Sequence, residues 1–462
     1  MKINIGFIPV MADLYNRLLP DLRGKLNKFA LQIGKELSDS NIDFKIFPVC
    51  SKDSEIKQQI KLAEDNGAEL IVIGLVSYAP SGQVAPALLE SQLPIVLWPA
   101  QPMLELKPAQ YDFDCVLLNH GVHGLQDVAN VLIKHNRPFG VIHGHHHQPE
   151  FKKELLVWAK AAHVLYAMKT SNPVSVGGHF EDMLDLQIGD GKFISRLGVK
   201  KCSISMAEFI NSAVSISERK ITDRVRHIRS SYEIDKGLSE ALLNKAVRHE
   251  LALRGLLKKN NSQAVGINFM TLCNDPGIAD ALHLAACTLM EDGFGYAGEG
   301  DWVTAAFLRG VLSAGLEASF SEIFSVGYLD NRLVLRHWGE GNPLLARSKP
   351  ILRASSFQDK HKAEFVVMDF EFSPGPATLI NLNADSHGQG RLICFEGVIE
   401  DEHLPAVDGP RAIFKPQNPD VRELLTSYAY NGGSHHLVLV RGDCRDVVDR
   451  ISKLTGWNTV NI

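Results

Sequence analysis

Apolar runs rich in β-branched residues alternate with helical patterns over the first 150 residues. The helical patterns include Gly24–Leu37 and Ser54–Asn66. This alternation predicts βαβ units built around a parallel sheet. The predicted strands are Ile3–Val10, Phe44–Val49, Leu70–Leu75, Ile95–Trp98, Val116–Leu118 and Gly140–His143.

The loops after these strands are the first place to look for a site, because parallel α/β sheets bind ligands beyond the carboxyl ends of their strands. Neither GxGxxG nor GxxxxGK(S/T) follows any predicted strand. The sequence therefore does not favour a dinucleotide site or a P-loop nucleotide site.

The pattern changes twice further along the chain. A segment from about Met168 to Leu316 contains a charged helical stretch, Ser217–Lys258, which we interpret as a solvated helical face. From Ser319 onward, short strands separated by Gly, Pro, Asn and Asp predict a mostly antiparallel β domain. We expect three domains: residues 1–167, 168–317 and 318–462. The predicted strands of the last domain are Ile323–Val326, Arg332–Trp338, Glu364–Phe372, Ala377–Leu382, Leu392–Val398, Ala412–Phe414 and His435–Val440.

Composition fits a globular protein with two or three domains and no nucleic-acid footprint. The 462 residues include 48 Lys+Arg and 53 Asp+Glu, a formal net charge of −5. We see neither a signal-peptide pattern nor an apolar run long enough to span a membrane, so we expect a cytoplasmic location. The seven scattered cysteines contain no CxxC pair. We expect reduced, buried thiols rather than disulfides or a zinc ribbon.

A glycine-rich segment, Met290–Trp302, is the most unusual part of the chain, with glycines at 293, 295, 298 and 300. Asp301 is a candidate N-cap for the apolar-periodic run that starts at Trp302. Glu299 would then lie just outside a helix N-terminus, which favours an ionised carboxylate. The alternative is a solvent-exposed loop glutamate.

A hairpin around residues 328–331 would bring a second carboxylate close to an imidazole. If Gly327 pairs with Arg332, Glu322 falls opposite His337, and directly paired residues share a face of the sheet. Such a pair has the geometry of metal ligands. The alternative is an exposed cross-strand ion pair.

Two adjacent histidines open the last predicted strand, in the segment Asn431–His436. Adjacent side chains of an extended chain point to opposite faces, so only one of His435 and His436 is expected to bind a given metal. Two carboxylates with one or two imidazoles suit a divalent ion such as Mn²⁺.

A second histidine cluster, His143–His147, has the spacing of a metal-binding tract. We interpret it as a polar loop after a strand, because no nearby carboxylate completes a ligand set.

Five segments in this order resemble the bacterial L-arabinose isomerases, within the L-fucose/L-arabinose isomerase group. They are GYAGEGDW with AAFLR, SFSEIF, LVLRHW, PGPA and NGGSHH, and GYAGEGDW is the most specific. The resemblance extends over nearly the whole chain. It implies two α/β domains, the first with a flavodoxin-like parallel sheet, followed by a mostly antiparallel C-terminal β-barrel domain.

The resemblance also implies a ligand set and a reaction. Glu299, Glu322, His337 and His436 would bind a divalent metal, usually Mn²⁺, the two glutamates would be the catalytic acid/base pair, and His435 would contact substrate. The implied activity is metal-dependent aldose–ketose isomerisation by enediol proton transfer, in a homo-oligomer (trimer or hexamer) with active sites at subunit interfaces. We expect a small sugar as the partner molecule, with neither nucleic acid nor membrane.

The substrate end of the pattern departs from the family. The run Gly-Ser-Gln-His-Leu-Tyr-Gly of the arabinose enzymes is replaced here by Pro9–Tyr15, and a sugar-contacting Phe is replaced near Leu272. We therefore expect a pentose or hexose other than L-arabinose. The expected substrate-binding residues are His435, Met11, Asp13, Tyr15, Tyr78, Phe180 and Leu272, of which Tyr78 and Phe180 are chosen from position only.

Two other functions remain open at this point. One is a carbohydrate-binding or regulatory relative that keeps the metal site without turnover. The other is a metal-dependent hydrolase or lyase using Glu299 and Glu322 around a bound water, which the absence of an HExxH helix makes the least favoured.

Overall fold

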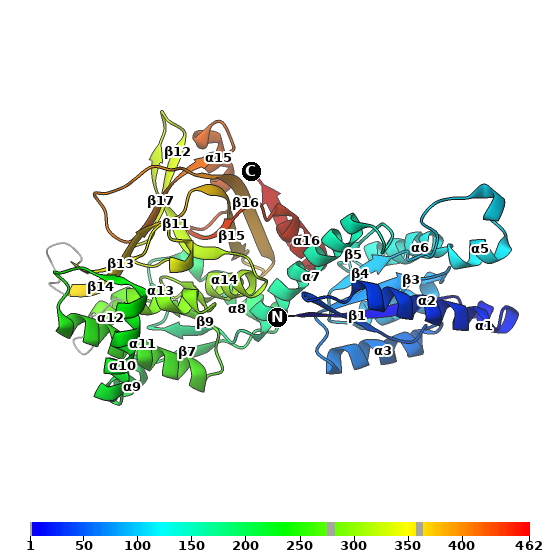
Figure 1. Cartoon of the computed structure of the whole chain (residues 1–462), viewed down its shortest axis with the longest axis horizontal. Helices are drawn as coiled ribbons and strands as arrows, with labels where there is room; N and C mark the ends of the chain where they lie inside the picture. Colours follow the sequence, from blue (N-terminus) through cyan, green and yellow to red (C-terminus); the bar gives the residue numbers. More distant parts are fainter. Residues whose placement is uncertain (1, 275–281, 357–363) are drawn as a thin grey trace. The chain divides into compact units, whose positions relative to one another are not determined.

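The computed structural model describes residues 2–274, 282–356 and 364–462, which form two compact units (Figure 1). The first unit contains Met1–His163 and Asp446–Trp457, and the second contains Val164–Arg445 and Asn458–Ile462. The division into three domains at residues 167 and 317 stays a prediction.

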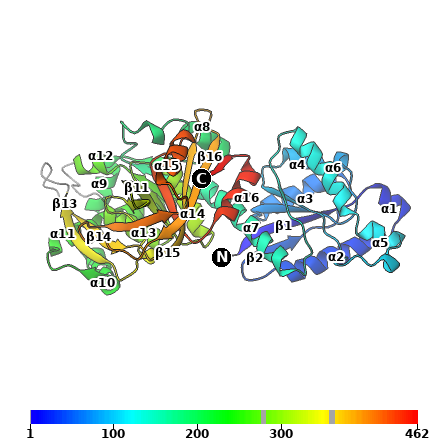
Figure 2. The same cartoon turned by 90° about the horizontal axis from the view of Figure 1, so that it is seen from above.

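The first unit is a doubly wound α/β domain. Its five parallel strands have the order β2-β1-β3-β4-β5, the flavodoxin-like order, as expected. Figure 2 shows α4 and α6 on one side of this sheet and α2 on the other. The strands are β1 (Ile3–Val10), β2 (Ile42–Ile46), β3 (Leu70–Leu75), β4 (Ile95–Trp98) and β5 (Gly140–Val141). The helices are α1 (Leu14–Leu18), α2 (Leu22–Leu37), α3 (Asp53–Asp65), α4 (Ser81–Glu90), α5 (Phe113–Leu118), α6 (Gly121–Lys134) and α16 (Arg445–Thr455), with a 3₁₀ turn at Pro108–Gln110. Helix α7 (Pro149–Thr170) begins in the first unit and ends in the second.

In β3 and β4, apolar and polar residues do not alternate, because helices cover both faces of the sheet. Every residue of β3 and of β4 is buried. This continuous apolar pattern is typical of parallel sheets.

Two strand predictions in this unit were wrong. Val116–Leu118 forms the end of α5, which begins where the Asp112 side chain accepts a hydrogen bond from the Cys115 amide. A three-residue apolar run does not distinguish a strand from a helix end. The N-cap at Asp112 favours the helix here. The strand predicted at Phe44–Val49 runs instead from Ile42 to Ile46.

The second unit begins with a four-stranded parallel sheet of order β10-β9-β6-β7. The charged stretch Ser217–Lys258 is helical, as expected, and consists of two helices separated by the short strand β8. The strands are β6 (Val174–Val176), β7 (Cys202–Ile204), β8 (Glu233–Ile234), β9 (Ala264–Ile267) and β10 (Gly295–Ala297). The helices are α8 (Asp190–Leu197), α9 (Met206–Val214), α10 (Glu218–Ser231), α11 (Glu240–Lys259), α12 (Phe269–Asn274), α13 (His283–Glu291) and α14 (Trp302–Ser313), with a 3₁₀ turn at Leu184–Leu186.

The remainder of the second unit is a closed antiparallel β-barrel. Six strands pair in the cyclic order β16-β15-β18-β11-β12-β17, and the pairing of β16 with β17 closes the ring. The expected antiparallel β-barrel is confirmed. The barrel strands are β11 (Ala318–Gly327), β12 (Arg332–Arg336), β15 (Gly375–Ala384), β16 (Gly390–Ile399), β17 (Pro410–Pro416) and β18 (His436–Arg441). Outside the ring are β13 (Ile351–Ser356), β14 (Glu364–Glu371), β19 (Asn458–Asn461), α15 (Val421–Tyr430) and a 3₁₀ turn at Pro343–Leu345.

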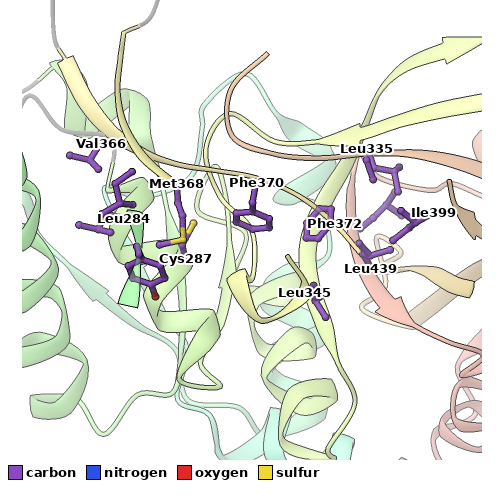
Figure 3. Close-up of a cluster of buried hydrophobic side chains, with 14 of the residues drawn as sticks. Leu284, Cys287, Leu335, Leu345, Val366, Met368, Phe370, Phe372, Ile399 and Leu439 are labelled. Atoms are coloured by element: carbon purple, nitrogen blue, oxygen red, sulfur yellow. The ribbon is translucent and has the colours of Figure 1, made fainter. Parts of the chain in front are cut away.

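One apolar core joins the barrel to the neighbouring helices. Figure 3 shows part of it, where Leu284 and Cys287 of α13 approach Met368 of β14, and Leu335 and Leu439 lie on barrel strands. Helix α14 packs against β11, β15 and β18. The barrel core therefore packs against α13 and α14, the helices on either side of the glycine-rich segment.

The model bears on two further points from the sequence. Within the described residues, no helix has the length and apolar character needed to cross a bilayer. The cysteines whose side chains are described are free thiols, as expected: Cys50, Cys115, Cys202, Cys287, Cys394 and Cys444. Cys115 and Cys202 are only partly buried, so the expectation of burial was wrong for these two.

We predict that Leu379→Ala lowers the free energy of unfolding by about 2–5 kcal/mol, the usual cost of truncating a buried leucine. Leu379 is fully buried on β15, where it pairs with Phe395 on one side and Leu439 on the other. Urea unfolding followed by circular dichroism measures the loss. Val398→Ala, on the exposed side of β16, is the matched control and should change stability by less than about 0.5 kcal/mol. Equal losses would contradict this description of the core.

Candidate metal and catalytic site

The glycine-rich turn between β10 and α14 positions Glu299. The φ angle of Glu299 is +51° and that of Gly300 is +79°. A residue with a side chain adopts this left-handed conformation only where its surroundings enforce it. Glu299 is 2% exposed, so the alternative of a solvent-exposed loop glutamate is wrong. The predicted N-cap is confirmed, because the Thr304 amide donates to the Asp301 carboxylate at 2.9 Å.

Glu322 lies on β11, and the hairpin that holds it differs from the predicted register. Gly327 pairs with Arg332 as predicted, but Glu322 pairs with Arg336 rather than His337. The cause is a β-bulge between Ile323 and Ser325, which adds one residue to β11 and shifts the pairing. The predicted pairing of Glu322 with His337 was therefore wrong by one residue.

The side chains of Glu322 and His337 nevertheless meet. His337 directly follows β12, and its Nε2 is 3.3 Å from Glu322 Oε1. The His337 side chain is 1% exposed and that of Glu322 is 12% exposed. The alternative of an exposed cross-strand ion pair is wrong.

His436 enters the site from the other neighbour of β11. It is the first residue of β18 and pairs directly with Glu322. Directly paired residues of antiparallel strands share a face, so the imidazole lies beside the Glu322 carboxylate. Of the two adjacent histidines only His436 joins this cluster, in line with the alternation expected of an extended chain.

These four side chains converge on one point. One ligand atom from each of Glu299, Glu322, His337 and His436 lies within 4.8 Å of the others. His436 Nε2 is 2.6 Å from Glu299 Oε2 and 3.1 Å from Glu322 Oε1. His337 Nε2 is 3.4 Å from Glu299 Oε1. We refer to these four residues as the Glu/His cluster.

Two further carboxylates orient the imidazoles. Glu340 is 2.6 Å from Nδ1 of His337, and Asp301 is 2.8 Å from Nδ1 of His436. Both carboxylates are buried. Since Nδ1 of each ring is taken by a carboxylate, Nε2 of each ring faces Glu299 and Glu322. Carboxylate–histidine pairs of this kind support metal-binding histidines in proteins.

The charges of the cluster shift the pKa values of its members strongly. Burial alone would raise the pKa of Glu299, but hydrogen bonds with His337 and His436 hold it at about 2. The pKa of Glu322 also lies well below its usual value, because the charges of the same two histidines outweigh burial. The two imidazoles shift in the opposite direction. Burial would lower the pKa of each, but the surrounding carboxylates raise both well above the usual value.

The donor set fits a divalent cation. Four ionised carboxylates, those of Glu299, Asp301, Glu322 and Glu340, surround two imidazoles in a buried place. An imidazole binds a metal only through an unprotonated nitrogen, so with both rings as neutral ligands four negative charges surround the site. A divalent ion offsets two of these charges, and the mixed carboxylate and imidazole donors suit Mn²⁺ or a similar ion.

His435 lies at the edge of the cluster and has a partner of its own. Its Nδ1 is 2.6 Å from Asp185, and its Nε2 is 3.9 Å from Glu322 Oε1. The His435 side chain is 34% exposed, so unlike His436 it is open to solvent. Nε2 of His435 has no hydrogen-bond partner within the described residues.

The remaining expected substrate residues are placed in both units. Phe180 lies against the glycine-rich turn, because its amide donates to the Glu299 carbonyl at 3.1 Å. Leu272 is fully buried on α12. The other four residues belong to the first unit: Met11 and Asp13 follow β1, Tyr15 lies on α1, and Tyr78 follows β3.

Within the first unit these four residues form one group. The Ala12 amide donates to the Tyr78 carbonyl at 2.7 Å, which joins the two loops. Asn16 and Ser51 donate to the Asp13 carboxylate, and the hydrogen bond from Asn16 is the first cause of its lowered pKa. Met11 is buried, whereas Asp13, Tyr15 and Tyr78 are partly exposed. The substrate contacts of all these residues stay predictions.

Models of three L-arabinose isomerase domains match consecutive parts of the chain. The N-terminal domain model matches residues 14–170, the central domain model 160–315 and the C-terminal domain model 317–458. The chain belongs to the arabinose isomerase-like family.

Individual relatives of the family agree with this assignment. The L-arabinose isomerase of Herpetosiphon aurantiacus is 28% identical over 79% of this chain and 75% of its own. That of Nocardioides sp. is 27% identical over 76% and 72%, and that of Mannheimia succiniciproducens is 24% identical over 95% and 90%. Among solved structures, an F420-dependent methylene-tetrahydromethanopterin dehydrogenase covers 57% of this chain at 15% identity, with a TM-score of 0.17.

Three carboxylates of this arabinose isomerase-like site lie beside Nδ1 of a histidine, and none of these contacts was predicted from the sequence. Asp301 was expected only as an N-cap, although it also holds His436. Glu340 follows His337 by three residues, a spacing that could have indicated it. Asp185 is 250 positions from His435, and no local pattern connects the two.

We predict that Gly300→Ala destabilises the protein far more than Gly315→Ala does. The two glycines have similar φ angles, +79° and +74°, so the left-handed conformation alone costs each alanine roughly 1–2 kcal/mol. A Cβ at Gly300 would also lie 2.1 Å from the Gly178 carbonyl oxygen, whereas one at Gly315 meets nothing within 4 Å. Urea unfolding of both variants measures the difference. Equal losses would show that the turn beside Glu299 is not as tightly packed as described.

Proposed function

We propose that this protein is a metal-dependent aldose–ketose isomerase that acts on a pentose or hexose other than L-arabinose. Membership of the arabinose isomerase-like family makes it a sugar isomerase that interconverts an aldose and a ketose. The metal dependence and the altered specificity are the steps that we add.

The convergence of Glu299, Glu322, His337 and His436 carries the proposal. These residues come from the β10–α14 turn, from β11, from the end of β12 and from β18, yet their ligand atoms lie within 4.8 Å of one another. Such convergence from four elements indicates a built site rather than a chance surface cluster. We propose that they hold a divalent metal, most readily Mn²⁺.

A divalent ion in this place would stabilise the negative charge that develops on the sugar oxygens during proton transfer. The residues of the chain supply the proton movements. Isomerisation removes a proton from C2 of the aldose, returns one to C1 and moves one from O2 to O1. A nearby carboxylate contributes about 10²- to 10⁴-fold to such a proton transfer.

Glu299 and Glu322 are the candidates for this shuttle. The low pKa values of both carboxyls keep them ionised and able to accept a proton at neutral pH. Glu322 is the more accessible of the two, with a side chain 12% exposed against 3% for Glu299. We therefore propose that Glu322 meets the sugar carbon first and that Glu299 completes the acid/base pair.

His435 is placed to contact a sugar oxygen. Asp185 holds Nδ1 of its ring at 2.6 Å, which orients Nε2 toward the Glu322 side of the site. An imidazole supported in this way can donate a proton to the ring oxygen when the sugar opens. We propose His435 as the general acid of ring opening.

The specificity proposal rests on the first unit. Its expected sugar contacts are Met11, Asp13 and Tyr15, in the run that replaces the Gln-containing run of the arabinose enzymes. Asp13 supplies an ionised acceptor for hydroxyl groups, and a site built to bind particular hydroxyls rejects sugars that lack them. We also propose a homo-oligomer, a trimer or hexamer, in which these loops complete the site of a neighbouring subunit. The cytoplasmic location stays a prediction.

The direct test is to incubate Mn²⁺-loaded protein with a panel of pentoses and hexoses, including L-arabinose. We expect interconversion of at least one aldose–ketose pair other than arabinose and ribulose, together with exchange of a C1 or C2 proton with solvent deuterium. Glu322→Gln and Glu299→Gln should lower kcat at least about 10²-fold, because each removes an acid/base group. Chromatography and NMR measure product and exchange.

Two results would contradict the proposal. If either glutamine variant kept its metal and turned over at the full rate, the carboxylate that it lacks would not be an acid/base group of the reaction. Thermal stabilisation by a sugar without product or deuterium exchange would instead favour the non-catalytic carbohydrate-binding relative.

We predict that Asp301→Asn weakens Mn²⁺ binding about 10- to 100-fold with little change in the thermal unfolding midpoint. Asparagine is as good an N-cap as aspartate, so α14 keeps its start. The substitution removes the negative charge beside Nδ1 of His436. Loss of a carboxylate that supports a metal-binding histidine typically lowers metal affinity about 10- to 100-fold. Isothermal titration calorimetry of metal-free protein measures the affinity. Asp301→Ala should lose both the cap and the affinity, and unchanged affinity in Asp301→Asn would argue against Asp301 as a support of a metal ligand.

A further inference from the structure

A second histidine cluster lies in the first unit, in the loop between β5 and α7. We expected a polar loop there, with no nearby carboxylate to complete a ligand set. The structure instead buries His145 and His146, which are 5% and 1% exposed. His147 remains half exposed. The expectation of an ordinary polar loop was therefore wrong.

The loop is held firmly in place by its neighbours. The Trp98 indole donates to the Gly144 carbonyl at 3.0 Å, and the His145 amide donates to the Gln148 side chain at 2.9 Å. The His146 ring makes edge contacts with Phe29 and Trp98, at 5.6 and 6.4 Å between ring centroids. The histidines thus occupy defined positions.

His146 is an unusual buried residue, because neither of its ring nitrogens has a hydrogen-bond partner within the described residues. Leaving a buried polar group without a partner costs about 1–3 kcal/mol. Such groups are rare in folded proteins and call for an explanation, of which a bound ion is one.

The missing carboxylate comes from α2. Glu36 lies in the last turn of that helix, and its Oε2 is 3.0 Å from Nε2 of His147 and 3.5 Å from Nε2 of His146. One ligand atom from each of the three histidines lies within 4.8 Å of the others. A cation here would also be favoured by the negative end of the α2 dipole.

His145 has one ring nitrogen that is suited to the same centre. Its Nε2 is 3.2 Å from the Pro102 carbonyl, so a proton on Nε2 can be donated there. Nδ1 then carries a lone pair, and its contact with the His147 amide is long, at 3.3 Å. A backbone carbonyl that fixes the far nitrogen of the ring is a common support for a metal-binding histidine.

We propose that His145, His146, His147 and Glu36 form a second metal site, specific for a borderline divalent ion of the Zn²⁺ class. Three imidazoles and one carboxylate suit Zn²⁺ better than Mn²⁺ or Mg²⁺, which prefer oxygen-rich sites. Zinc bonds of about 2.1 Å join ligand atoms at most about 4.2 Å apart, so the rings close in slightly on binding. The site ties the loop after β5 to the end of α2 and is structural.

The test measures bound zinc in full-length protein that has been freed of metal, dialysed against micromolar Zn²⁺ and analysed by mass spectrometry. We expect Glu36→Gln and His146→Ala each to lose one equivalent per chain relative to wild type. Zn²⁺ should raise the thermal midpoint of the wild type more than that of either variant. Glu36 is half-buried on the helix surface, so its variant keeps the test valid if His146→Ala does not fold.

Two controls separate this site from other metal binding. His143→Ala alters an exposed histidine of the same loop and should retain full zinc. His436→Ala removes a ligand of the Glu/His cluster. In this background, adding Glu36→Gln should still lower bound zinc by one equivalent per chain, so the result does not depend on the proposed isomerase activity. Unchanged zinc in both Glu36→Gln and His146→Ala would overturn the proposal. An equal loss in His143→Ala would also overturn it, by showing unspecific binding to a histidine-rich loop.

Discussion

The site depends on one electrostatic constraint, the burial of four carboxylates around two imidazoles. Removing ionised groups from water costs several kcal/mol for each ion, unless partners compensate. Here every member has a partner, since Asp301 and Glu340 hold the Nδ1 sides of His436 and His337. Because those sides are occupied, both Nε2 atoms must face the remaining carboxylates. The arrangement therefore leaves a buried excess of negative charge at one defined point, which is the condition that a divalent cation relieves.

The barrel satisfies this constraint because β11 pairs with β12 on one side and β18 on the other. Glu322 lies on the shared strand, His436 on one neighbour and His337 just beyond the other. Because of the bulge after Ile323, Glu322 pairs with Arg336, and His337, one residue beyond the ladder, meets Glu322 through its side chain. Phe320, fully buried two residues before Glu322, lies edge-on to both imidazoles and fills the space beneath them. Three neighbouring strands of the barrel thus position Glu322, His337 and His436, which a single hairpin could not do.

Much of this could be predicted from the sequence where the signal is local. Apolar runs rich in β-branched residues predicted β1, β3 and β4 with their bounds, and the apolar-periodic run from Trp302 predicted the Asp301 cap. The register of Glu322 could not be predicted, because a bulge has no signature in a run such as Phe320–Gly327. The same holds for partners brought by tertiary packing, such as Asp185 on His435 and Glu36 on His147, which are 250 and 111 positions apart in the chain. Charged pairs of this kind depend on the folded chain and leave no periodic pattern.

The two histidine clusters show why spacing in the sequence is a poor guide to what a cluster binds. His337 and His436 are far apart in the chain and face two carboxylates, so their donors resemble those of oxygen-preferring ions. His145, His146 and His147 are consecutive and meet one carboxylate, which favours a nitrogen-preferring ion. The first cluster is assembled by barrel strands and lies where a substrate can reach Glu322 and His435. In the second, the His146 ring lies against Phe29 and Trp98, and His147 is exposed. Because two of its three imidazoles are buried, the second cluster favours a structural role, whereas the partial exposure of Glu322 and His435 leaves the first open to chemistry.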